Sequence, residues 1–594
     1  MKLKRLFTGL LILTLSSLAH THSNADLGHS RTAQITTFVN VNVIPMDRER
    51  ILNNQTVIIR DGRISTIGWA ATTKVPKGAT RIDGRGKYLM PGLVDMHTHL
   101  YSQTEMPLYI ANGVTTVFNM DGRPAHLGWR ERIARGEMFG PTIYTCGPKF
   151  DRARTPEEAV RMVDEQSTAG YDAIKIYNQV SKEEYPALIE AAKSHNLIIV
   201  GHVPREPGFE ATLKAGQAIA HAEEYIYTFF NDTADIDKIK LDESRIPHAV
   251  GLTRAAGIWV TPTLVTYDQI VQQADDLNAF LARPELKYIA LPLRERFSPE
   301  NNRYKRAFNN SQVPKLKQVL AFQKKLVEAL HEAGVPILVG TDAPDVGPAA
   351  GFSVHEELRN LIECGFTPFE ALQAATRDSA KILKGENEFG TVSVGKRADL
   401  ILLEANPLKD VAFAARRAGV MIRGRWLPES ELHRMLNNLP ATYAKEEQFV
   451  RTNLEKDVQK ALRYLDEKDP INQLSSAVLT NISLEQGTDK LRTIVREIKK
   501  INPNATLIQE RTINALGYRL LGRKRMKEAI EIFRLNVETY PKSANTYDSL
   551  AEAYAANGNT ELAIEYYKKA LEVNPNYPNA EYATEFLKKF NRTN

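Results

Sequence analysis

Eight short apolar runs alternate with stretches of helical periodicity in the central part of this 594-residue chain. The runs cover residues 89–97, 114–120, 142–147, 173–177, 198–203, 218–223, 259–267 and 336–343. Helix-compatible sequence lies between most of them, as at 181–196 and 316–334. Eight strands that alternate with helices over about 250–300 residues predict an α/β fold, the (β/α)8 TIM barrel. A doubly wound open sheet shows the same alternation, and periodicity alone does not exclude it.

Two all-β segments flank this region. Residues 34–88 alternate β-branched and polar residues between turn signals such as Asn53-Asn54 and Asp61-Gly62, and a similar pattern returns at 388–436. One small domain assembled from both segments explains their separation, because the intervening chain would then be an inserted domain. We therefore expect a composite β-sandwich around a barrel of residues 89–387.

The C-terminal part of the chain is helical and repeats itself every 34 residues. A helical linker is expected at 437–509 and repeats at 510–590. The recurring positions are Ala529, Phe533 and Pro541, which return as Ala563, Tyr567 and Pro575. This pattern resembles tetratricopeptide repeats, which implies an all-α domain that contacts a protein partner or another subunit. Because all candidate chemistry lies earlier, we expect a chain ending near Glu447 to keep its activity.

The N-terminus resembles a secretory signal peptide. A basic start is followed by an apolar run at 6–18 and by small residues, so we expect a signal peptide at 1–25 with cleavage after Ala19 or Ala25. Export to the periplasm or the medium would follow. The apolar run is too short for a transmembrane helix, and no other segment could span a bilayer.

Charge gives no indication of a nucleic-acid partner. The formal net charge is +6, and removal of Lys2, Lys4 and Arg5 with the signal peptide leaves 6 − 3 = +3. The remaining basic residues are dispersed, whereas nucleic-acid binding needs a concentrated basic surface.

Six residues with metal-binding chemistry lie at or near the ends of the predicted strands. They are His97, His99, Lys175, His202, His221 and Asp342. Each also fits a structural role, since Lys175 could extend its ammonium group to solvent and Asp342 could cap a helix. However, the carboxyl ends of barrel strands meet at one face, so six such residues there predict a shared metal site.

The motifs around these residues carry a resemblance to the amidohydrolase superfamily. They are PGLVDMHTH, GVTTV, DAIKIY, GHV, AHAEEY, GTDAP and GTVSVGKRADLILLE, within residues 34–426. The sequence is most similar to the imidazolonepropionase-like and Xaa-Pro dipeptidase-like branch. This resemblance implies an enzyme that hydrolyses carbon–nitrogen bonds with bound metal.

The resemblance also implies roles for individual residues. Two divalent metal ions are expected, with zinc as the best fit and manganese or cobalt as alternatives. His97 and His99 would hold one ion, and His202 and His221 the other. Lys175, converted by CO2 into a carbamate, would bridge both, and Asp342 would be both a ligand and the catalytic residue that transfers protons. Such a pair of ions activates hydroxide for attack on a carbonyl.

The substrate class is less defined by the sequence. A small-molecule amide is expected, either a dipeptide or an N-acyl amino acid. A cyclic amide, lactone or ester hydrolase with the same site is one alternative, and an interaction protein with an inactive barrel is another. Candidate substrate-binding residues are Tyr177, Tyr225 and His355. The long, arginine-rich connection at 268–314 could cover the site and pair with a substrate carboxylate.

Overall fold

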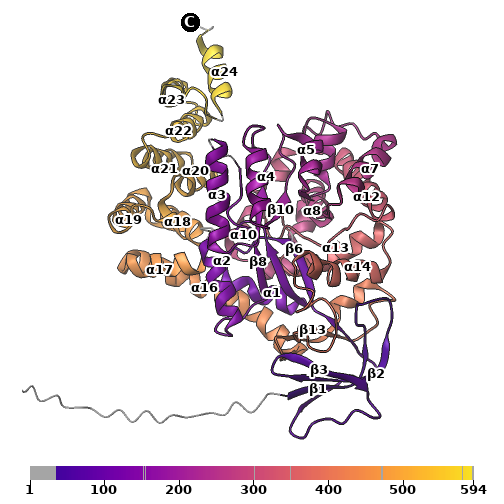
Figure 1. The fold of residues 1–594 in the computed structure, drawn as a ribbon. Coiled ribbons are helices and arrows are strands. Elements are labelled where there is room, and N and C mark those ends of the chain that lie inside the picture. Colours follow the sequence, from indigo (N-terminus) through magenta and orange to yellow (C-terminus); the bar gives the residue numbers. More distant parts are fainter. Residues whose placement is uncertain are drawn as a thin grey trace, which may run out of the picture.

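The computed structural model of the chain describes residues 35–591 except 152, 154, 300, 348, 470–472 and 578 (Figure 1). The predicted signal peptide and both cleavage positions lie outside the described residues. Within the described part, we find no helix with the length and apolar character needed to cross a membrane.

Seven parallel strands form two sheets in the central region. The first sheet contains β6 (Leu93–Thr98), β7 (Val114–Asn119) and β8 (Thr142–Thr145). The second contains β9 (Ala173–Ile176), β10 (Ile198–Gly201), β11 (Ala218–Ala220) and β12 (Val260–Thr261). Consecutive strands are neighbours within each sheet, as expected where a helix connects each parallel pair.

Isolated parallel bridges join the two sheets into a ring. Cys146 pairs with Ala173 between β8 and β9, and Val260 pairs with Ile337 beyond β12. The segment 336–343 then returns to β6, where Thr98 pairs with Ala343 and the Met96 amide donates to the Val339 carbonyl at 2.8 Å. The pairs run around a closed circle, and the carboxyl ends of its strands lie on one face.

Four of the eight predicted runs differ from the structure. In the sixth, 218–223, β11 ends at Ala220 and α6 (Glu223–Tyr225) begins at the last residue of the run. The last, 336–343, is extended but makes only bridges and has no named strand. In the seventh, the strand ends at Thr261 and α8 (Leu264–Asp275) begins three residues later. The first starts too early, because Leu89 belongs to β5 of the other sheet. Apolar residues continue across these boundaries, so hydrophobicity did not mark them.

Helices follow the strands around the ring. They are α1 (Met106–Ala111), α2 (Pro124–Ala134), α3 (Pro156–Ala169), α4 (Tyr185–Ser194), α5 (Gly208–Ala215), α6 (Glu223–Tyr225), α7 (Ile246–Ala256), α12 (Val313–Glu332), α13 (Phe352–Glu363), α14 (Pro368–Ala374) and α15 (Arg377–Ile382). Local sequence sets their ends: Thr155 accepts a hydrogen bond from the Glu158 amide at the start of α3, and Gly170 ends it with φ 88°. Both helical stretches quoted from the sequence correspond to α4 and α12.

The flanking β segments form a single mixed sheet with its own core. The strands are β1 (Ile35–Val43), β2 (Leu52–Arg60), β3 (Arg63–Trp69), β4 (Thr80–Asp83), β5 (Tyr88–Pro91), β13 (Leu400–Leu403), β14 (Arg417–Ile422) and β15 (Arg425–Pro428). Antiparallel pairing of β5 with β13 joins the two chain segments. The expected sandwich is thus one connected eight-stranded sheet that branches at β1, which pairs with β2, β4 and β5.

The C-terminal region is entirely helical in its described part. It comprises α16 (Glu429–Lys456), α17 (Val458–Lys468), α18 (Gln473–Gln486), α19 (Thr488–Ile501), α20 (Glu510–Gly522), α21 (Met526–Thr539), α22 (Ala544–Ala556), α23 (Thr560–Val573) and α24 (Ala580–Asn591). Gly517 of α20 faces Phe533 of α21 so closely that an added Cβ would lie 2.5 Å from the ring. One apolar core runs from Val450 to Ala583, so the segment expected as a linker packs with the repeats.

The helical region rests against the barrel (Figure 1). Trp129 of α2 donates its indole N–H to the Glu467 carbonyl at 3.0 Å, and Arg132 pairs with the Glu467 carboxylate at 2.8 Å. A chain ending at Glu447 would be cut inside α16 and would lose these contacts. The activity of a chain that ends there stays a prediction, and the structure shows that its end would lie inside α16.

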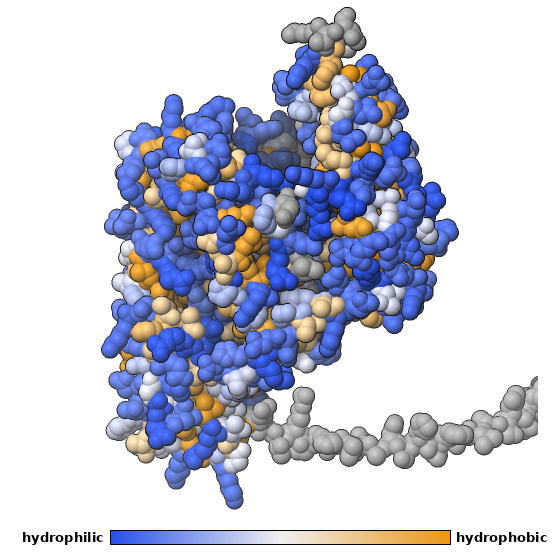
Figure 2. Space-filling view, turned by 180° about the vertical axis from the view of Figure 1, so that it is seen from behind, coloured by the Kyte–Doolittle hydropathy of each residue, from blue (hydrophilic) through white to orange (hydrophobic). Residues whose placement is uncertain are grey.

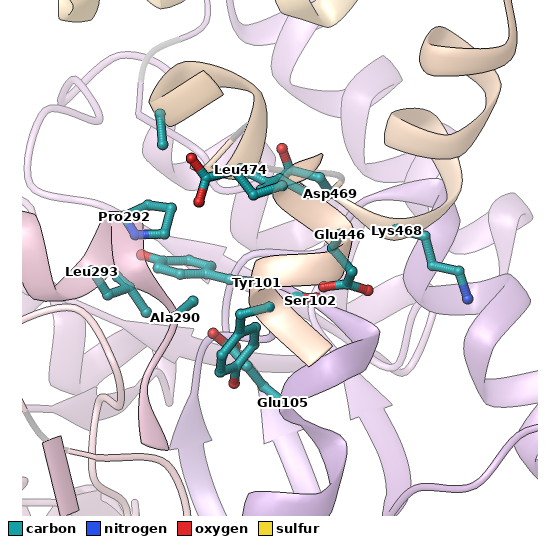
Figure 3. A pocket seen from close by; sticks show the side chains of 13 residues that line it. Tyr101, Ser102, Glu105, Ala290, Pro292, Leu293, Glu446, Lys468, Asp469 and Leu474 are labelled. Atoms are coloured by element: carbon teal, nitrogen blue, oxygen red, sulfur yellow. The ribbon is translucent and has the colours of Figure 1, made fainter. Parts of the chain in front are cut away.

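A buried cavity lies at this interface (Figure 3). Tyr101 and Glu105 line it from the barrel side, and Glu446 and Asp469 from the helical side. Burial, together with the charge of Asp469, raises the pKa of Glu105 to about 8. The interface therefore holds a carboxyl group that favours its protonated form.

We expect protein stability to fall as the pH rises toward 8. Because the folded-state pKa of Glu105, about 8, exceeds its ordinary value of 4.5, the unfolded chain binds fewer protons between these values. Removing the charge in Glu105→Gln should reduce the loss of Tm between pH 6 and pH 8.5 by a few degrees. Thermal melts across this range test it, with exposed Glu131→Gln as the control; equal pH slopes in all three proteins would contradict it.

Candidate metal centre

The structure brings the six predicted residues together at the carboxyl face of the ring. His97 lies within β6, His99 follows it, Lys175 lies within β9, His202 and His221 follow β10 and β11, and Asp342 lies in the 336–343 segment. Lys175 is 2% exposed although it carries an ionisable group. A buried lysine among histidines is costly unless it has a chemical partner, which indicates a functional cluster.

Asp342 is the centre of the first part of the cluster. Its Oδ1 atom lies 3.1 Å from His97 Nε2 and 3.0 Å from His99 Nε2, and Lys175 Nζ lies 3.3 Å from His97 Nε2. Donor atoms around a tetrahedral ion with bonds of 2.0–2.1 Å are about 3.3 Å apart. Imidazole nitrogens and carboxylate oxygens are also the donors that zinc and similar ions prefer. The residues present therefore fit a metal site.

His202 and His221 form the second part. The ring of His221 lies 4.6 Å from that of His97 and 4.7 Å from that of His202, measured between centroids. Their Nδ1 atoms have partners, with Glu224 Oε1 2.8 Å from His202 and Thr263 Oγ1 2.7 Å from His221. Holding Nδ1 leaves Nε2 of each ring available as a ligand, as second-layer contacts do in metal proteins.

The backbone at the site adopts unusual conformations. His221, Thr263 and Asp342 have φ values of 76°, 46° and 56°, in the left-handed region. This region is unfavourable for a β-branched residue such as Thr263. Strained residues of this kind persist where the surrounding structure holds them and are concentrated at functional sites. Asp95 supplies part of that support, because its carboxylate accepts the amides of His97 and Thr341 at 3.2 and 3.1 Å.

The protonation states of three of the four histidines favour metal binding, whereas burial of His99 is outweighed by the charges of Asp345 and Asp342, which raise the pKa of this imidazole. Burial lowers the pKa of His97 to about 3 and also lowers the pKa values of His202 and His221, so these imidazoles are neutral. Burial lowers the pKa of Lys175 to about 8. Burial alone would raise the pKa of Asp342, but the neighbouring histidines outweigh it and hold that pKa well below its ordinary value.

The three predicted substrate-binding residues have different positions. Tyr177 borders the site, with its ring centroid 4.4 Å from that of His202. Tyr225 is fully buried, and its hydroxyl lies 3.1 Å from Thr253 Oγ1, so this residue belongs to the core. His355 also lies in the core, where its Nε2 atom is 2.9 Å from the Asn112 carbonyl. The predictions for Tyr225 and His355 were wrong, because nearness in sequence to a ligand does not fix side-chain direction.

Sequence reasoning missed several residues at the rim. Asp345 Oδ2 lies 3.6 Å from His99 Nε2, and the Asp345 carboxylate also accepts from the Tyr101 hydroxyl and pairs with Arg296 at 3.4 Å. Arg296 comes from α10 (Leu291–Phe297) in the 268–314 insertion. The remaining insertion helices are α9 (Leu277–Leu281) and α11 (Arg303–Ala307). The sequence signal for Asp345 was its position three residues after Asp342. This spacing does not match the two-residue period of a strand, so it did not indicate that both carboxylates lie at the site.

Comparison with known families identifies the chain. The amidohydrolase family description matches residues 88–427 of 594, which is more than half of the sequence. The chain belongs to the amidohydrolase family. The prediction of an enzyme that hydrolyses carbon–nitrogen bonds is thereby confirmed. This amidohydrolase also carries a tetratricopeptide repeat match at residues 545–577, which covers nearly all of α22, all of α23 and the four residues after it.

Known proteins resemble the amidohydrolase part. The imidazolonepropionase of Mycolicibacterium smegmatis is 23% identical over 60% of this chain and 85% of that protein. A solved structure from Bifidobacterium longum, described as a "putative prolidase", is 26% identical with a TM-score of 0.51, covering 68% of this chain and 99% of that one. The structure of a Xaa-Pro dipeptidase with bound methionine has a TM-score of 0.51 at 20% identity, covering 66% and 100%. The predicted branch resemblance is confirmed.

Proposed function

We propose that the protein is a binuclear metal-dependent hydrolase that cleaves the amide bond of a dipeptide or a similar small substrate. The observation that carries the proposal is the shared use of Asp342. Its Oδ1 atom lies 3.1 Å from His97 Nε2 and 3.0 Å from His99 Nε2, and the potential ligand atoms of Asp342, His97 and His221 lie within 4.8 Å of one another, so Asp342 contacts residues of both halves of the site. Lys175 Nζ lies 3.3 Å from His97 Nε2, which supports a role for this lysine between the two halves of the site.

Two divalent ions, with zinc the best fit, would lower the pKa of water and polarise the scissile carbonyl when bound. His97 and His99 would hold one ion, and His202 and His221 the other. Lys175 is proposed to react with CO2, forming a nitrogen–carbon bond and releasing a proton to give a carbamate. Its lowered pKa of about 8 favours this reaction, because the neutral amine is the nucleophile.

Asp342 is proposed to move the proton of the reaction. Its carboxylate is ionised and lies 3.0 Å from His99 Nε2. An ionised carboxylate at the attacking position can accept a proton from water and return it to the departing nitrogen. The amide carbon–nitrogen bond is broken, the water oxygen remains on the acyl product, and the leaving amine takes the proton.

Glu223 favours a dipeptide over an N-acyl amino acid. It lies two residues after His221, and its Oε2 atom is buried with no hydrogen-bond partner among the described residues. Glu223 interacts electrostatically with Asp342 and with Tyr267, so it lies near the candidate metal centre. Burial raises the pKa of Glu223 to about 8, and an ammonium group, which a dipeptide has and an N-acyl amino acid lacks, would stabilise its ionised form. The name of the Bifidobacterium relative, a "putative prolidase", supports the same choice.

We expect Glu223→Gln to raise KM for dipeptides about tenfold, because the loss of one charge-assisted contact weakens binding of the ammonium group. Hydrolysis of the matching N-acetyl amino acid should change far less. Steady-state kinetics on the two substrates measure the difference, and Glu210→Gln on the exposed surface of α5 is the control. Equal effects on both substrates would assign Glu223 a structural role.

Metal content tests the proposal against an inert barrel. We expect purified full-length protein to contain about two equivalents of metal and to lose dipeptide hydrolysis after chelation, with recovery on addition of zinc. Protein that folds without metal and hydrolyses none of a dipeptide, cyclic amide and lactone panel would instead favour the interaction protein. Preferential lactone or ester hydrolysis would favour the alternative enzyme.

Export is proposed from the N-terminal sequence alone. A basic start and an apolar run at 6–18 support a cleaved signal peptide. N-terminal sequencing of the protein from a fractionated Gram-negative host tests this: a periplasmic product that begins at residue 20 or 26 is expected. An intact Met1 in cytoplasmic protein would contradict it.

A further inference from the structure

The first repeat helix, α20, is connected to the metal centre through the insertion. Arg523, just after the end of α20, forms an ion pair of 3.1 Å with Glu295 of α10. The next residue, Arg296, reaches Asp345, which lies 3.6 Å from His99. These contacts hold the C-terminal end of α20 at the rim of the site.

The N-terminal end of α20 interacts electrostatically with a second part of the rim. The charge of Arg511 acts on Arg123 and Asp121, which form a 2.6 Å ion pair after β7. Asp121 accepts the amide of Lys149, whose ammonium group lies 4.0 Å from the Tyr177 ring centroid. Since Tyr177 packs against His202, both ends of α20 are linked to the catalytic face.

A groove lined by polar and aromatic residues lies along the side of α20 that also faces α22. Its volume is about 660 Å³, and its lining includes Glu510, Arg511, Asn514, Tyr518, Tyr540 and Asn545. The Glu510 carboxylate accepts a hydrogen bond from the Asn545 side-chain amide at 2.9 Å. The molecular surface has a hollow between the barrel and the repeat helices, with mainly hydrophilic residues around it (Figure 2). Side-chain amides offer donors and acceptors that match a peptide backbone, and tyrosine rings offer faces for apolar side chains.

Arg511 is the basic residue in the lining of this groove. It is exposed, and no ion pair or hydrogen bond joins it to another described residue. Partial burial and repulsion from Arg123 lower its pKa, so an added anion would stabilise its charge. A carboxylate suits this position because guanidinium groups bind carboxylates through two parallel hydrogen bonds.

We propose that the groove of the repeat domain is a substrate subsite of the enzyme itself. It receives the C-terminal part of an oligopeptide whose scissile amide lies at the metal centre, and Arg511 binds the terminal carboxylate. This inference rests on the proposed function. It assigns the repeats to the enzyme's own substrate, and it predicts a preference for peptides longer than two residues.

Peptide length gives the physical basis for this preference. An extended chain advances about 3.3–3.6 Å per residue, so a dipeptide of about 7 Å stays at the metal centre. A pentapeptide extends about 17 Å, so its C-terminal part reaches beyond the metal centre, and the proposal directs that part toward α20. The added contacts lower KM for the longer peptide, because they form in both the ground and the transition state.

Binding measurements test the subsite without requiring hydrolysis. In the full chain carrying Asp342→Asn, a fluorescent pentapeptide acid should bind about tenfold more tightly than its C-terminal carboxamide. Arg511→Ala should abolish this difference, Arg511→Lys should keep part of it, and Arg525→Ala, outside the groove, should leave it intact. Circular dichroism melts confirm folding of each variant. Equal affinities of acid and amide in the protein with Arg511 would overturn the proposal.

Kinetics separate this proposal from the proposed function. In otherwise wild-type protein, the kcat/KM ratio of pentapeptide to dipeptide should fall about tenfold in Arg511→Ala and stay constant in Arg525→Ala. Dipeptide hydrolysis with no Arg511-dependent ratio would leave the function intact and overturn the subsite. Arg511-dependent peptide binding without any peptide hydrolysis would support the subsite and contradict the proposed reaction.

Discussion

Asp342→Asn should lower turnover by about 10³-fold while the protein keeps its fold and part of its metal. The carboxylate lies 3.1 Å from His97 Nε2 and 3.0 Å from His99 Nε2, and its pKa is held well below the ordinary value. An amide keeps the size and one oxygen donor but cannot accept a proton at neutral pH, and general base catalysis contributes about 10²–10⁴-fold.

The measurement is kcat on a dipeptide together with metal analysis of the same sample. Asp164→Asn, on an exposed face of α3, is the matched control and should behave as the wild type. Wild-type turnover in a metal-loaded Asp342→Asn protein would exclude Asp342 from proton transfer. Complete loss of metal would instead show that its main role is as a ligand.

Lys175→Ala should abolish activity and reduce the bound metal below two equivalents. The side chain is 2% exposed and lies 3.3 Å from His97 Nε2, so alanine leaves a buried gap where the proposed bridging anion would stand. Two cations close together repel each other strongly when no anion lies between them. The loss of the bridge therefore affects both metal ions as well as catalysis.

Chemical rescue provides the specific test for Lys175. Adding a short carboxylic acid to Lys175→Ala should restore part of the activity, because it can occupy the gap as a bridging anion. Lys193→Ala, in the last turn of α4, is the control and should need no rescue. Two bound metals and near-native turnover in Lys175→Ala would exclude the carbamate.

The sequence alone was sufficient for the family, the order of most elements and the meeting of six candidate ligand residues at one face. Strand ends of a parallel ring must meet at one face, so residues such as His97 and His202, far apart in the chain, could be placed together in advance. The 34-residue period likewise predicted the repeats, because the buried positions of stacked helices recur at fixed spacing. Ala529 and Ala563 are both fully buried in the structure.

Only the tertiary structure decided which neighbours support the site. Glu224 and Thr263 orient His202 and His221 through hydrogen bonds of 2.8 and 2.7 Å, while Tyr225, next in sequence to Glu224, points into the core. Side-chain direction there depends on the turn after β11, where His221 has φ 76°. Local periodicity carries no information on such a conformation, because it is imposed by packing.

The position of the repeats beside the catalytic face was also decided by tertiary structure. Sequence distance suggested an independent module, yet Arg523 pairs with Glu295 at 3.1 Å across more than 200 residues of chain. Such contacts between charged residues at a domain interface have no sequence pattern, since each residue would be equally compatible with solvent in the separate domains. Sequence determines what each element can bury and which chemistry it carries, whereas the docking of whole domains depends on surfaces that exist only after each domain has folded.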